Sequence, residues 1–297
     1  MNSNIKKALL FIGMTFAINY LLVYGYLAMG GKWGMPGALV VAMGYMFVPM
    51  LVVIALHRGV YREAWIRPLD VALRPNRWFL VAWLLLPLIA FATLGVSLLF
   101  PGVEYSPDMA GMFERFGSVL TPEQLEGMER QVAGFPVHLI WIAFLQGLIA
   151  GITVNAVPGF GEKLGWRGFL QRELGYLGFW KSSAVIGVIW GVWHAPLILQ
   201  GHNYPGHPVA GVLMMTVFTM LLSPIFSYVR LRARFVLAAA IIHGLLNATA
   251  GLVIMVVKEG SSLLVGVTGL AGFIVLALAN AGLRVYRALA REPIMVG

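Results

Sequence analysis

The chain has 297 residues, of which 60% are hydrophobic and only 11% are charged, whereas soluble domains carry about 25% charged residues. The mean hydropathy is +0.84, which excludes a soluble fold because a domain of this size cannot bury so much apolar surface. The lack of cysteine excludes disulfides, thiolate ligands and a cysteine nucleophile. We expect a single all-α domain over residues 1–297, a polytopic bundle of transmembrane helices.

Several segments reach the roughly 20 apolar residues that cross about 30 Å of hydrocarbon. Eight spans are expected, at about 8–29, 36–56, 78–99, 138–158, 182–200, 210–229, 235–257 and 263–282. The first is too long for the apolar region of a signal peptide, so we expect a retained helix.

The basic residues predict the orientation of these spans. If both termini are cytoplasmic, all of the 21 lysines and arginines lie inside except Lys32, Arg115, Arg130 and Lys258, as the positive-inside rule requires. The net charge of +9 then reflects membrane topology, and no nucleic-acid partner is expected. The expected location is an integral membrane protein, in the inner (plasma) membrane if the source is bacterial.

Two connecting segments stand out. Residues 101–137 are expected outside and are acidic, and Thr121 before Pro122 is typical of a helix N-cap. This pattern predicts one or two short amphipathic helices there. Residues 158–181 are expected to form a cytoplasmic loop, with an interfacial helix over Gly165–Leu174 because this segment has an apolar and a charged side.

Few ionisable or amide side chains occur near the apolar spans. His194 lies in the fifth span, and His243 and Asn247 share one face of the seventh. Each alone is more typical of a hydrogen bond between helices than of catalysis. At about 1.5 Å per residue, however, both histidines lie roughly 12–18 Å from the cytoplasmic ends of their spans. Glu162 could join them if the fourth helix extends inward and the chain breaks near Pro158, Gly159 and Gly161.

Three motifs in order match a known family. They are the string GEKLGWRGFL over 161–170, WxxxH over 190–194 and HxxxN over 243–247. Together they resemble the motifs of the CAAX prenyl protease and bacteriocin-processing (CPBP, or Abi) family of intramembrane endopeptidases, over a core of about residues 138–250. The residues that carry the resemblance are Glu162, Trp166, Arg167, Trp190, His194, His243 and Asn247.

The resemblance implies a conical, membrane-accessible cavity in the bundle. It implies that Glu162 and His194 activate a water for attack on a peptide carbonyl, and that His243 and Asn247 stabilise the oxyanion. The expected substrate is a hydrophobic or membrane-anchored peptide or protein, processed as CAAX proteins or bacteriocin- and pheromone-like peptides are. Family members are described both as glutamate-dependent enzymes and as metalloproteases. The question of Zn²⁺, with Glu162, His194 and His243 as ligands, therefore stays open.

Lys163 departs from the family pattern, which usually has a second glutamate there. In a helix Lys163 and Arg167 would repel each other at i,i+4, so Arg167 would need another partner, with Glu162 and Glu173 nearest in sequence. This substitution keeps open a second function, a catalytically silent scaffold that binds hydrophobic peptides. A proton-coupled transporter is a third, weakened by the lack of a visible inverted repeat.

Overall fold

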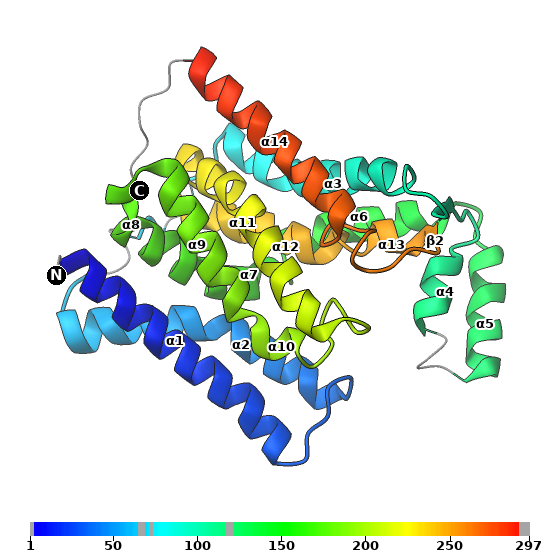
Figure 1. Cartoon of the computed structure of the whole chain (residues 1–297), viewed down its shortest axis with the longest axis horizontal. Coiled ribbons are helices and arrows are strands. Elements are labelled where there is room, and N and C mark those ends of the chain that lie inside the picture. Colours follow the sequence, from blue (N-terminus) through cyan, green and yellow to red (C-terminus); the bar gives the residue numbers. More distant parts are fainter. Residues whose placement is uncertain (1–2, 65–68, 72–73, 117–120, 291–297) are drawn as a thin grey trace.

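The structure, a computed structural model, describes residues 3–64, 69–71, 74–116 and 121–290. These residues form a bundle of helices with one short antiparallel pair of strands (Figure 1). Within these residues six helical segments are long and apolar enough to cross a membrane. They are α1 (Ser3–Ala28), α2 (Pro36–Ala55) continued by the π-helix η1 (Leu56–Tyr61), α3 (Arg77–Ser97), α11 (Pro208–Ala233), α12 (Val236–Thr249) continued by α13 (Leu252–Met255), and α14 (Leu270–Leu289).

The expected all-α polytopic bundle is confirmed, with fewer full-length spans than eight. The expected fifth span, 182–200, is divided into α9 (Phe179–Trp193) and α10 (Ala195–Ile198). Pro196 lies in the first turn of α10, where its missing N–H and its ring prevent α9 from continuing. At 15 residues, α9 is shorter than the roughly 20 residues of a standard crossing.

The fourth expected span is bent, and the bend lies before the predicted position. Helix α6 (Leu139–Ile152) meets the helical segment Ala156–Glu173 at 46°, across Thr153, whose ψ of −96° is not helical. Pro158 falls in the first turn of α7 (Ala156–Lys163), where proline is tolerated. The prediction of a break at Pro158, Gly159 and Gly161 is therefore wrong.

The prediction of an interfacial helix over 165–174 is also wrong. The π-helix η2 (Leu164–Leu170) is buried throughout, and so is most of the following α8 (Gln171–Glu173), which leads to the 3₁₀ turn η3 (Gly175–Leu177). The charged residues of 165–174 have partners inside the bundle, so this segment can be buried instead of lying at the membrane surface.

The sequence predicts one or two short helices in the segment 101–137, and its described residues contain α4 (Ala110–Phe116) and α5 (Pro122–Ala133). Thr121 and Gln124 form a reciprocal capping box at the start of α5. Strand β1 (Glu104–Tyr105) pairs antiparallel with β2 (Val257–Lys258) and ties this segment to the end of α13. In Figure 1 α4 and α5 lie at one end of the molecule, beside the main bundle.

Candidate functional site

Helix α12 packs closely against both α6 and α7 because glycines face these contacts, Gly151 on α6, Gly159 on α7 and Gly244 on α12. A Cβ on Gly244 would lie 2.0 Å from the Gly151 carbonyl oxygen, and one on Gly159 would lie 2.9 Å from the Ala240 oxygen and 3.3 Å from the His243 Cβ. Small residues let helix backbones approach one another in this way. The glycines near Glu162 therefore serve close packing, and they bring the start of α7 against the His243 turn of α12.

Glu162, Lys163 and His243 form the buried centre of the site. The Lys163 ammonium donates a hydrogen bond to Glu162 Oε1 at 2.7 Å, and His243 Nδ1 lies 3.6 Å from the same oxygen. Exposure is 1% for Glu162, 0% for Lys163 and 4% for His243. Residues 81 positions apart thus meet in an environment with almost no solvent, as the sequence predicted for Glu162 and His243.

Aromatic rings enclose the Lys163 ammonium. Its Nζ lies 3.5 Å from the centre of the Trp190 ring on α9 and 4.8 Å from that of Phe226 on α11. A desolvated cation over an aromatic face gains up to about 2 kcal/mol. The pair with Glu162 and the two rings together explain how a lysine is held without solvent.

Among the described residues, the two hydrogen bonds of the Arg167 guanidinium go to neutral groups, while its Nε is buried without a partner. Its guanidinium donates to Ser223 Oγ at 2.9 Å and to Ser227 Oγ at 3.0 Å, both on α11. Glu173, a partner considered from the sequence, instead forms an ion pair with Arg172 at 2.8 Å. Glu162 therefore does not depend on Arg167, and its direct partner is Lys163.

His194 and Asn247 lie at the edge of this centre. His194 Nδ1 lies 2.7 Å from the Trp190 carbonyl oxygen; if this nitrogen carries the proton, Nε2 is the acceptor. The Trp190 ring contacts both histidines, with its centre 5.8 Å from the His194 ring and 6.0 Å from the His243 ring. Asn247 is exposed one turn beyond His243, within hydrogen-bonding reach of its ring.

Comparison with known families identifies the central segment of the chain. Residues 136–249 match the family model described as type II CAAX prenyl endopeptidase Rce1-like. The central segment is Rce1-like. The match lies almost wholly within the core of 138–250 expected from the sequence and contains every residue of the site, which confirms the resemblance over this segment. A search of curated proteins returned no match.

The described side chains of the Rce1-like segment do not form a metal site. Within the residues that the structure describes, no three histidine, aspartate or glutamate side chains approach closely enough to hold an ion. The Glu162 oxygen nearest His243 is bonded to the Lys163 ammonium. The donor set of Glu162, His194 and His243 therefore does not fit Zn²⁺ in this arrangement.

Several residues that shape the Rce1-like site lie outside its motifs. Asn19 on α1 accepts from Trp193 Nε1 at 2.9 Å and donates to the Tyr45 carbonyl at 2.9 Å. Asn19 is a buried amide in an apolar helix, and that alone could have drawn attention to it. Phe226 and the two serines that bind Arg167 give no comparable signal, because apolar and hydroxyl residues are common in such helices.

Proposed function

We propose that this chain is an intramembrane endopeptidase that hydrolyses a peptide bond of a membrane-associated protein or peptide, with CAAX-type processing the favoured class. The Rce1-like match supports the family-level activity. The assignment of these residues to the reaction depends on one observation. Glu162 Oε1 and His243 Nδ1 lie 3.6 Å apart, and both side chains are buried. Carboxylate and imidazole groups in dry sites are suited to general acid–base work.

In the proposed reaction Glu162 accepts a proton from a water whose oxygen bonds to the peptide carbonyl carbon. His194 orients this water through Nε2. The carbonyl π electrons move to oxygen, and this oxyanion accepts hydrogen bonds from the His243 ring and the Asn247 amide, each donor being worth about 2.7–4 kcal/mol in comparable sites. The C–N bond then breaks, and Glu162 returns its proton to the amine.

The exposure of Asn247 indicates the side from which the substrate reaches Glu162 and His243. The amide is exposed while Glu162 and His243 are buried, so a substrate carbonyl would meet Asn247 first. Glu162 must release Oε1 from Lys163 or act through its second oxygen. Lys163 is then the cation that holds the carboxylate between turnovers.

A silent peptide-binding scaffold is the second candidate, and one observation favours it. The Lys163 ammonium already occupies Glu162 at 2.7 Å with 0% exposure. A carboxylate held in this way is a weaker acceptor for a water proton. On this view the fold binds hydrophobic peptides without cleaving them.

One assay separates the two candidates. Wild type, Glu162→Gln and Lys163→Glu are compared in liposomes on a library of lipidated and unmodified peptides, with Glu173→Gln as the matched control. For the endopeptidase we expect wild-type cleavage, a loss of about 10²–10⁴-fold in Glu162→Gln and little change in the control. Cleavage that survives Glu162→Gln would falsify the mechanism. Peptide binding without turnover in wild type would favour the scaffold.

A further inference from the structure

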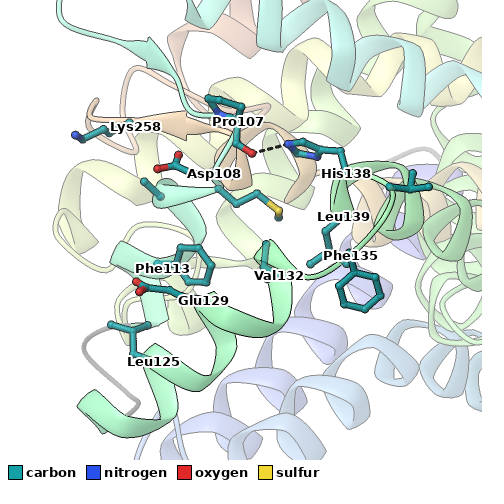
Figure 2. Close-up of a pocket in the computed structure, with 13 residues that line it drawn as sticks. Pro107, Asp108, Phe113, Leu125, Glu129, Val132, Phe135, His138, Leu139 and Lys258 are labelled. Atoms are coloured by element: carbon teal, nitrogen blue, oxygen red, sulfur yellow. Dashed lines mark hydrogen bonds between the residues drawn. The ribbon is translucent and has the colours of Figure 1, made fainter.

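A cavity lies far from Glu162, between α4, α5, the start of α6 and β2 (Figure 2). Its volume is about 910 Å³, near the upper end of the range of about 300–1,000 Å³ for small-molecule sites. Helix α6 has 14 residues and so puts about 21 Å between this cavity and the α6–α7 bend. It is therefore separate from the candidate active site.

The walls of this cavity are fixed in place. His138 Nε2 lies 2.7 Å from the Pro107 carbonyl oxygen, and its Nδ1 accepts from the Ile140 N–H at 3.2 Å, which together link the two sides (Figure 2). A Cβ on Gly111 would lie 2.0 Å from the Val257 oxygen, so glycine allows α4 to lie directly on β2. The cavity is thus built by specific contacts.

The lining combines apolar side chains with charged side chains. Phe113, Val132, Phe135 and Leu139 supply apolar surface (Figure 2). The charged residues that line the cavity are Asp108, Glu129 and Lys258. Two carboxylates thus face one ammonium, and the local balance is acidic.

The acidic balance extends over the whole segment 101–137, although the net charge of the chain is +9. Residues 101–137 contain six acidic residues and two arginines. The Ser106 hydroxyl and nearby backbone N–H groups lower the pKa of Asp108, which therefore stays anionic at neutral pH. On α5 Arg130 pairs with Glu126, whereas Glu129 faces the cavity (Figure 2).

The geometry points to a binding site for a short cationic amphipathic peptide segment, with apolar side chains in the cavity and lysine or arginine beside Asp108 and Glu129. A peptide fits better than a lipid with a cationic headgroup, because α5 is polar and mostly exposed and therefore favours water over hydrocarbon. This inference does not depend on the proteolytic function.

Fluorescence anisotropy on the full chain in detergent tests the site. The probe is a fluorescein-labelled hexapeptide of alternating leucine and lysine, with the leucine–glutamate peptide and a fluorescent lysophosphatidylcholine as comparisons. We expect Glu129→Gln to weaken lysine-peptide binding about two- to fivefold, as loss of one exposed ion pair does. Glu126→Gln, the same change on the same helix outside the cavity, should leave binding unchanged.

Filling the cavity gives an independent arm. Val132→Trp should weaken binding at least about tenfold because the larger indole ring fills the apolar part of the cavity. Leu125→Trp serves the same purpose if the first variant fails to fold. Binding should also weaken between about 0.05 and 0.5 M salt as the charges are screened. Equal binding of the glutamate peptide, equal effects of both glutamine variants, preferential binding of the lysolipid, or no peptide binding would each overturn the inference.

Discussion

Breaking the buried Glu162–Lys163 pair one side at a time should destabilise the protein far more than removing both charges together. At 2.7 Å two unit charges attract by about 6 kcal/mol at an effective dielectric constant of 20, and desolvation of the two ions offsets much of this. Removing one partner leaves an uncompensated buried charge, which costs about 3–5 kcal/mol. We expect that loss for Glu162→Gln and for Lys163→Met, and a double variant within about 1–2 kcal/mol of wild type.

Unfolding free energies in mixed micelles, measured as a double-mutant cycle, check this expectation. The partly exposed pair Lys7–Glu63, with N and O 3.0 Å apart, is the matched comparison, and its removal should cost at most about 1 kcal/mol because exposed ion pairs contribute little. Single variants that each cost less than about 1 kcal/mol, with additive effects in the double variant, would refute the argument. The pair would then be hydrated, and Lys163 would not restrain Glu162.

Three further predictions follow from the packing, the pH-sensitive groups and the topology. Gly244→Ala should lower the unfolding free energy by about 1–3 kcal/mol, as overpacking does, and should reduce cleavage; Gly251→Ala, with open space around its Cα, should be neutral or slightly stabilising in the same measurement. Burial lowers the pKa of His202, which packs against Trp33. The unfolded chain therefore binds the proton at a higher pH than the folded chain, and the melting temperature should fall as pH drops below about 6.5. His202→Gln should flatten this pH dependence of the melting temperature, and an unchanged slope would contradict the argument. A cysteine introduced at Glu126 in this cysteine-free chain should react with an impermeant thiol reagent only from outside, and labelling only from the cytoplasm would reverse the topology.

Features that depend on local sequence could be predicted. Apolar length identified the membrane helices, because crossing hydrocarbon requires a contiguous run of residues. The capping box at Thr121 and Gln124 also follows from neighbouring residues alone. The motif spacing on three segments indicated Glu162, His194, His243 and Asn247, and the structure brings Glu162 and His243 together.

Only the tertiary structure decided which charged side chains are buried and which groups they pair with. On an isolated helix Lys163 would face Arg167 one turn on, and adjacent residues such as Glu162 and Lys163 would not face each other. In the fold α9 and α11 supply Trp190 and Phe226 around the ammonium, and Arg167 turns to serines on α11. The burial of 164–173 and the bend at Thr153 likewise depend on helices distant in the chain. A charge removed from water takes the partner that the surrounding helices place beside it, and sequence spacing within one helix does not contain that information.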